Sequence, residues 1–228
     1  MTSPSVGVLN EGPLHASLKE WYRRPGDVVE QPLEGFVIDL VRSGMLIEIQ
    51  TGGFSSMRRK FDHLLDRHPV LLVHPVATEK HIVKLDDEGG VVSRRKSPRR
   101  GAAVDVCSEL VSFPSLLSHP NFTLEVVLAS EEEVLREDSA KGWRRGGWVV
   151  EERRLVEVVN RVLFEFPQDL LQLVPPDMAD SFTTADLDTA LGRPRRLAQE
   201  LAYCLSTSDA IESIGRDRRG VLYRAPSH

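Results

Sequence analysis

The amino-acid sequence predicts a mixed α/β protein that ends in a basic unit of two helices and a hairpin. Apolar residues recur at helical spacing in some segments and form short, strand-length runs in others. Hydrophobic residues make up 41% of the 228-residue chain, which is enough for a packed core and argues against wholesale disorder. After residue 180, two capped helices and two short strands replace the earlier pattern.

Charge and cysteine content narrow the classes of protein to consider. The formal net charge is −5, and the basic residues gather in local patches, which permits nucleic-acid binding without requiring it. Cys107 and Cys204 lie too far apart for a CxxC zinc site and are too few for a disulfide framework. No apolar run approaches the roughly 20 residues that cross a bilayer, and no secretory signal is visible. We therefore expect a cytoplasmic protein without a membrane span.

The first half of the chain predicts the element order α-β-β-β-α-β-β. A helix over residues 10–22 carries Leu14 and Leu18 on one side, with Asn10 as its cap. A second amphipathic helix covers residues 54–67. The expected strands cover residues 28–31, 36–41, 45–50, 70–73 and 81–85. Ser43-Gly44 is expected to be the tight turn of a hairpin between the second and third strands.

The middle of the chain is less distinct. We expect a basic loop over 94–100, a helix over 101–112, a strand over 122–128 and a turn-rich hairpin over 136–149. Residues 153–166 mix alternating and helical spacing, so their structure stays open. The predicted domains are a core with its extension, a connecting region and a C-terminal domain, at 8–135, 136–180 and 181–226.

The C-terminal segment predicts a winged helix-turn-helix. Thr183 or Thr184 caps a helix over 185–191, Gly192 closes it, and a second helix runs to about residue 206. Two short strands, 210–214 and 220–224, flank a basic turn. Six arginines are candidate DNA contacts at the second helix and the wing: Arg193, Arg195, Arg196, Arg216, Arg218 and Arg219. A purely protein-binding role is the alternative for this unit.

Two acidic residues stand out on the predicted hairpin. Asp39 interrupts an apolar strand, and Glu48 lies on the returning strand with Gln50 on the same face. The turn brings Asp39 near Glu48, and two neighbouring carboxylates raise each other's pKa unless a cation neutralises them. A hard ion such as Mg²⁺ prefers oxygen ligands of this kind. The sequence therefore predicts a divalent-metal site, to which the carbonyl of Ile49 can also contribute.

This arrangement resembles the active-site pattern of the PD-(D/E)xK nuclease superfamily, which is an Asp, a hairpin and then Glu-x-Lys. Here it reads Asp39, then Glu48-Ile49-Gln50, with Gln in place of the usual Lys. A Glu in the first core helix is frequent in these nucleases, and Glu11 fits that position. The resemblance covers residues 8–75, and more loosely the whole chain is similar to an uncharacterised bacterial family with a C-terminal winged helix.

The resemblance implies a restriction-endonuclease-like core that hydrolyses DNA with Mg²⁺ or Mn²⁺, as an endonuclease or an exonuclease. Glu11, Asp39 and Glu48 would hold the metal, and Gln50 would take the place of the usual Lys, although it carries no charge. Lys60, on the helix that follows the hairpin, can supply the missing cation, with Arg58 and Arg59 as alternatives. By analogy, the role would lie in bacterial DNA repair or defence, with a possible protein partner.

Other residues receive ordinary interpretations. The histidines lack HExxH-type spacing and are expected to be surface or core residues: His15, His63, His68, His74 and His81. Trp143 and Trp148 can stack on bases but are expected to pack instead. Two alternatives to the nuclease stay open. One is a catalytically inactive DNA-binding or adaptor protein that retains the nuclease scaffold, which the Gln at position 50 favours, and the other is a protein-binding regulator.

Overall fold

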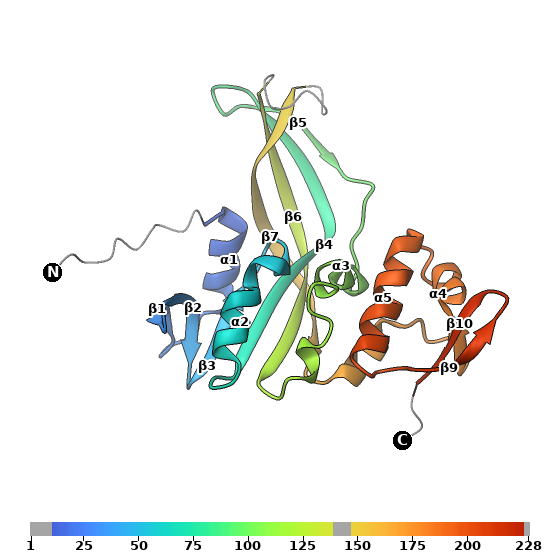
Figure 1. Ribbon diagram of the computed structural model, residues 1–228. Helices are drawn as coiled ribbons and strands as arrows, with labels where there is room; N and C mark the ends of the chain where they lie inside the picture. The colour runs from blue at the N-terminus through green and yellow to red at the C-terminus, as the bar shows by residue number, and fades with distance from the viewer. Residues whose placement is uncertain (1–10, 139–146, 226–228) are drawn as a thin grey trace.

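The computed structural model describes residues 11–138 and 147–225. A seven-stranded mixed sheet crosses the molecule in the order β1-β2-β3-β4-β6-β7, and β5 pairs with β4 beside this path (Figure 1). A second sheet of three strands, in the order β8-β10-β9, lies with α4 and α5 at the C-terminal end of the chain. The predicted mixed α/β class is confirmed.

The elements that carry the candidate site come first in the chain. Helix α1 spans Pro13–Tyr22, and Gly12 is its N-cap, whereas the predicted cap Asn10 lies outside the described residues. Strands β1 (Val28–Leu33), β2 (Phe36–Arg42) and β3 (Met45–Ile49) pair antiparallel. Ser43 and Gly44 both have positive φ, 49° and 87°, as the two central residues of a type I′ hairpin turn require.

A helical crossover returns the chain to the sheet beside β3. It consists of a 3₁₀ turn, η1 (Phe54–Met57), and helix α2 (Arg58–Leu64), close to the predicted 54–67. Strand β4 (Val70–Leu85) then pairs parallel to β3, and β6 (Phe122–Glu137) pairs parallel to β4. The two strands predicted at 70–73 and 81–85 are therefore one continuous strand.

The long strands extend beyond the helices as an arm (Figure 1). Strand β5 (Val91–Lys96) pairs antiparallel with β4, so the first three residues of the basic stretch predicted as a loop, 94–96, are strand. Strand β7 (Trp148–Phe164) pairs with β6 along its length. Much of the predicted connecting region 136–180 thus belongs to the sheet, and residues 153–164, whose structure the sequence leaves open, are strand. Trp143 lies outside the described residues, whereas the ring of Trp148 packs under Lys84.

Short helical turns cover one face of the sheet: η2 (Ala103–Val106), α3 (Cys107–Leu110), η3 (Leu116–Ser118) and η5 (Pro167–Leu173). The C-terminal elements are β8 (Ser181–Thr183), α4 (Thr184–Leu191), α5 (Arg195–Thr207), β9 (Glu212–Asp217) and β10 (Gly220–Arg224). Thr183 caps α4 in a capping box with Asp186, and Gly192 ends it at φ 57°, so the predicted start and stop are confirmed.

Two hydrophobic clusters lie on opposite faces of the sheet. The smaller one packs Leu14 and Leu18 of α1 on Ile47 and Ile49 of β3. The larger one joins α2, α3 and the sheet to α4 and α5, so the predicted boundary near residue 181 does not separate two independent cores. The site described next lies where β2 and β3 pass between these two layers.

Candidate functional site

The β2–β3 hairpin positions two buried carboxylates. Leu40 pairs with Ile47 in the antiparallel register, which places Asp39 beside the end of β3 that carries Glu48. Asp39 is only 8% exposed and Glu48 only 4%. The backbone N–H of Ile49 donates to Oδ2 of Asp39 at 2.8 Å, so the strand itself fixes this carboxylate.

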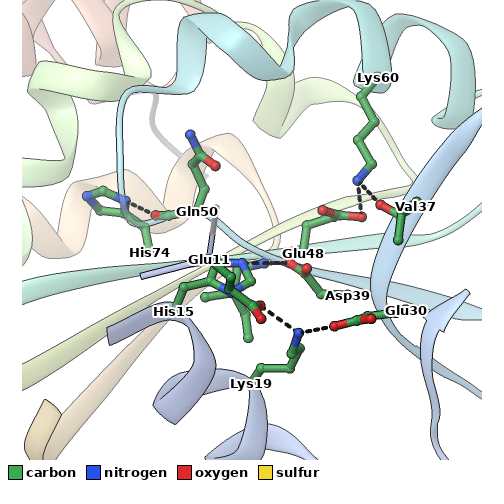
Figure 2. A network of polar contacts seen from close by, with 11 residues as sticks. Glu11, His15, Lys19, Glu30, Val37, Asp39, Glu48, Gln50, Lys60 and His74 are labelled. Atoms are coloured by element: carbon green, nitrogen blue, oxygen red, sulfur yellow. Dashed lines mark hydrogen bonds and ion pairs between the residues drawn. The ribbon is translucent and has the colours of Figure 1, made fainter. Parts of the chain in front are cut away.

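Helix α1 brings a histidine to Asp39, and Glu11, just before the helix, adds a third carboxylate. Nε2 of His15 lies 3.2 Å from Oδ2 of Asp39, and its Nδ1 contacts Oε1 of Glu11 (Figure 2). The ammonium group of Lys19 then bonds Glu11 at 2.5 Å and Glu30 at 2.8 Å. The imidazole of His15 therefore bridges two carboxylates, and Lys19 anchors the outer one.

Lys60 reaches Glu48 from the opposite side of the sheet. Its Nζ lies 2.5 Å from Oε1 of Glu48 and donates a hydrogen bond to the carbonyl of Val37 at 2.7 Å. Because both side chains are largely buried, the contact with Glu48 is a close ion pair shielded from water. The predicted cation is thus next to the predicted carboxylate.

The charges at Asp39 and His15 stabilise each other. Burial by itself would raise the pKa of Asp39, but His15 and the Ile49 N–H outweigh it and hold this pKa below its usual range. Burial likewise opposes the charged form of His15, yet its bonds to Asp39 and Glu11 raise its pKa. Both shifts therefore favour the charged His15–Asp39 pair.

Glu48 behaves in the opposite way. Burial is the largest cause and raises its pKa to about 7, the positive charge of Lys60 opposes the rise, and the negative charge of Asp39 adds to it. The ion pair with Lys60 therefore does not fully offset the cost of burying this carboxylate. A divalent cation beside Glu48 and Asp39 would supply further positive charge.

The donor set fits a divalent metal. One ligand atom each from Glu11, His15 and Asp39 lie within 4.8 Å of one another. Glu48 is not part of this set, but its buried carboxylate, paired with Lys60, lies beside it (Figure 2). Two carboxylates with an imidazole suit Mn²⁺ at least as well as Mg²⁺, because nitrogen ligands are uncommon for Mg²⁺.

The side chain of Gln50 makes its hydrogen bonds away from the carboxylates. Its side-chain Nε2 donates to the carbonyl of Gly53 at 2.8 Å and to Oγ of Ser56 at 3.3 Å. Figure 2 shows this side chain turned away from Asp39 and Glu48. The alternative cation Arg58 is also directed elsewhere, to the carbonyl of Ser112 and the ring of Phe113.

Sequence reasoning missed His15, which was expected to be an ordinary histidine. The signal is its spacing: Glu11, His15 and Lys19 follow at intervals of four, so they form one ridge along the start of α1. A search for metalloprotease-type spacing does not find this ridge, because its third polar partner, Asp39, comes from a distant strand.

The six C-terminal arginines divide into two groups. Three are paired with acids: Arg193 with Asp105, Arg196 with Glu200 and Arg219 with Asp186. The other three are exposed and have no partner in the described parts of the chain: Arg195, Arg216 and Arg218. The unpaired arginines lie at the start of α5 and on the β9–β10 hairpin.

Fold and site together define a mixed α/β protein with a buried carboxylate–histidine–lysine cluster between its sheet and its first helix. The chain belongs to the family described as Domain of unknown function (DUF8091), whose model matches residues 12–165. It is also similar to an uncharacterized protein of Treponema pallidum (strain Nichols), at 29% identity over 185 residues, covering 80% of this chain and 73% of the relative. No solved structure matches the chain. Within 11–138 and 147–225, no helix is long and apolar enough to cross a membrane.

Proposed function

We propose that the protein is a metal-dependent nuclease that hydrolyses phosphodiester bonds in DNA. The observation that carries this proposal is the convergence of Glu11, His15 and Asp39, with the Glu48–Lys60 ion pair next to Asp39. Asp39 and Glu48 come from two paired strands, as the resemblance to the PD-(D/E)xK superfamily implies, and Glu11 comes from the residues just before the first helix. Their burial gives each charge more effect than it would have in bulk water.

The order of the elements supports a restriction-endonuclease-like core. The sequence α1-β1-β2-β3-α2-β4 joins an antiparallel hairpin to a parallel strand through a helical crossover. Helix α1 covers one face of the hairpin and α2 the other. The candidate residues then lie on the central strands of the core rather than on mobile loops, which favours a fixed geometry.

Glu11, Asp39 and Glu48 would hold Mg²⁺ or Mn²⁺, and His15 is a further candidate ligand. When bound, the ion would polarise the scissile phosphate and lower the pKa of a coordinated water. The Ile49 N–H keeps Asp39 oriented toward the site. Lys60 would place its ammonium group beside the developing negative charge, in the role that Gln50 cannot fill because it is neutral.

The C-terminal unit would position the duplex as a winged helix-turn-helix. Helices α4 and α5, joined by a short turn, precede the β9–β10 hairpin, which has the position of a wing. Arg195 at the start of α5 suits a recognition helix, and Arg216 and Arg218 suit phosphate contacts of the wing. We place this activity in the cytoplasm, in bacterial repair or defence, by analogy alone.

The second candidate function is a catalytically inactive DNA-binding or adaptor protein. Two observations favour it: Lys60 already neutralises Glu48, and the amide of Gln50 bonds Gly53 rather than facing the carboxylates. In this case the cluster would stabilise the scaffold, and the C-terminal arginines would carry the function.

The test is a cleavage assay with supercoiled plasmid and linear DNA, with Mg²⁺, Mn²⁺ or EDTA. We expect cleavage only with metal, with Mn²⁺ at least as effective as Mg²⁺, because His15 adds a nitrogen donor. Asp39→Asn and Glu48→Gln should each lower the rate by at least about 100-fold, since each removes a negative charge at the metal.

The matched control is Asp62→Asn, on α2 but outside the cluster, which should cleave like the wild type. Cleavage that persists in EDTA or in Asp39→Asn would contradict the nuclease assignment. Salt-sensitive DNA binding without cleavage by the wild type would establish the inactive alternative instead.

A further inference from the structure

A polar cavity lies beyond the end of β3. Its volume is about 460 Å³, and strands β4, β6 and β7, helix α3 and the loop that follows β5 surround it. Its polar lining includes His74, Lys80, Arg99, Glu109, Glu133 and Arg153. Figure 2 shows His74 on the opposite side of Gln50 from Glu48, so the cavity and the carboxylate cluster share one strand end.

The loop that carries Arg99 is fastened to β4. The N–H of Ser97 donates to the carbonyl of Lys80 at 2.7 Å, and the N–H of Gly101 donates to that of Ala77 at 2.8 Å. A Cβ at Gly101 would lie 2.6 Å from this same carbonyl, so the close approach needs glycine. Arg99 is therefore presented to the cavity by a loop with a defined position.

The charges around the cavity are unequally satisfied. Lys80 pairs with Glu133 at 3.0 Å, and Arg153 pairs with Glu131 at 2.7 Å. The side chain of Arg99 has no partner in the ranges that the structure describes. The cavity thus offers one unpaired guanidinium to an anion, and Arg is suited to planar, bidentate recognition of phosphate.

His74 and Glu109 offer acceptors in the same cavity. Nδ1 of His74 must donate to the carbonyl of Gln50, at 2.7 Å, because a carbonyl oxygen can only accept. Burial lowers the pKa of His74, so the ring is neutral and its Nε2 is an acceptor. Glu109 accepts one N–H, from Phe54, at 3.3 Å and retains further acceptor capacity.

We propose that this cavity binds one nucleotide unit, with its phosphate on Arg99 and its hydroxyl or amino donors on His74 and Glu109. The volume lies in the range of small-molecule sites. Gln50 and Thr51, which continue β3 beyond Glu48, bond directly to His74 and Arg153 of the cavity. A DNA strand bound at the carboxylates would therefore have a neighbouring nucleotide within reach of the cavity.

The inference rests on the proposed function for its class of ligand, but its test needs no cleavage. The ligand can be a unit of a bound strand or a free mononucleotide, and both share the same chemistry. Binding is measured by calorimetry in EDTA with four probes: deoxyadenosine monophosphate, deoxyadenosine, inorganic phosphate and an eight-residue oligodeoxyadenylate. Arg99→Ala is compared with Arg100→Ala, the adjacent arginine that does not line the cavity.

We expect Arg99→Ala to weaken binding of the mononucleotide or the oligonucleotide by at least about tenfold, whereas Arg100→Ala changes it less than about twofold, because a charged hydrogen bond is worth that much. Deoxyadenosine should bind the wild type more weakly than its monophosphate, and phosphate should compete. An effect of Arg99 on the oligonucleotide alone identifies a strand subsite, and an effect on the mononucleotide identifies a nucleotide site.

The inference is overturned if no probe depends on Arg99, or if Arg100→Ala weakens binding as much as Arg99→Ala. Its failure is distinct from failure of the proposed nuclease. If binding depends on Arg99 but the protein never cleaves DNA, the nucleotide site is supported and the nuclease activity is refuted. If cleavage is metal-dependent but Arg99→Ala does not change binding, the nuclease activity is supported and the nucleotide site is refuted.

Discussion

At the scale of single residues, Asp39 and Glu48 differ in how their negative charges are compensated. Asp39 accepts bonds from His15 and from the Ile49 N–H, which hold its pKa low. Glu48 is more deeply buried, and this burial raises its pKa to about 7 although Lys60 opposes the rise. One carboxylate is therefore ionised at neutral pH, and the other can still take up a proton or release one to bind a cation.

The first prediction concerns stability without metal. The unfolded state ionises Glu48 near the ordinary glutamate pKa of 4.5, whereas the folded state keeps the proton to about pH 7. The free energy of unfolding should therefore fall as pH rises between these values, by about 2–3 kcal/mol. The raised pKa of His15 acts in the same direction, because its stabilising charge disappears as pH rises through that pKa.

Urea denaturation in EDTA at pH 5 and pH 8 measures this difference. Glu48→Gln should flatten the pH dependence, whereas Glu20→Gln, on the exposed side of α1, should leave it unchanged. An equally steep decrease in the Glu48→Gln variant would show that Glu48 is not the group responsible.

The second prediction concerns Lys60. Lys60→Met should lower the cleavage rate by about 100-fold or more, because it removes the ammonium group beside Glu48. Lys60→Arg should recover part of the rate, and the exposed neighbour Arg59→Met should have little effect. Single-turnover cleavage of labelled DNA gives the rates. An unchanged rate in Lys60→Met would remove this residue from the mechanism.

At the scale of elements, helix α1 places two members of the cluster. Its apolar side packs Leu14, Leu18 and Tyr22 on the sheet, and this packing directs Glu11 and His15 toward Asp39. The helix, the hairpin and its turn could be predicted, because their signals are local: helical spacing, and Ser-Gly between apolar strands. The contact of His15 with Asp39 could not, since it depends on the angle at which the helix crosses the sheet.

The long strands escaped prediction for an identifiable reason. The outer half of β4 and β6 carries charged residues whose partners lie on neighbouring strands, such as Lys80 with Glu133 and Arg94 with Glu132. In the sequence, such residues resemble a loop. In β7, Val156 and Val159 form bulges, because neither residue has a partner in β6. Each bulge interrupts the regular alternation of side chains between the two faces of the sheet.

The same bulges explain exposed apolar side chains at the edge of the sheet. Val156 is 56% exposed and Val159 is 58% exposed, and both lie where the register of β7 against β6 shifts. At the other edge, β1 contains Pro32 and a positive φ at Glu30. Both edges are thus poor templates for an additional strand.

The third prediction tests the docking of α1. Leu18 is fully buried beneath the helix, so Leu18→Ala should lower the free energy of unfolding by about 3 kcal/mol. Ser17→Ala, on the exposed side, should change it by less than about 0.5 kcal/mol. Urea denaturation measures both. A decrease below about 1 kcal/mol for Leu18→Ala would mean that α1 does not depend on this contact.

At the scale of the whole molecule, the sheet and the C-terminal elements share one core. Oγ of Ser108 on α3 donates to Glu200 on α5 at 2.6 Å, and Arg193 pairs with Asp105. The helices and strands of this unit could be predicted from caps and spacing. Its attachment to the sheet could not, because the contacts join residues about 90 positions apart.

The fourth prediction concerns DNA binding by this unit. Replacing the unpaired arginines Arg195, Arg216 and Arg218 by alanine should weaken binding and lower the slope of log affinity against log salt by roughly 0.9 for each phosphate that the variant no longer neutralises. Fluorescence anisotropy with duplex DNA in EDTA measures both quantities. The charge-matched control replaces three exposed arginines elsewhere: Arg23, Arg67 and Arg154. Equally weakened binding in both triple variants would indicate general charge rather than this unit.

Binding of Mn²⁺ to the protein, followed by electron paramagnetic resonance, shows whether the buried carboxylates hold a metal ion. The wild type should bind Mn²⁺ at one site whose affinity increases with pH up to about neutrality, as Glu48 loses its proton. Asp39→Asn should weaken this binding by at least about tenfold. Equal Mn²⁺ binding by the wild type and Asp39→Asn would contradict a metal site at these carboxylates.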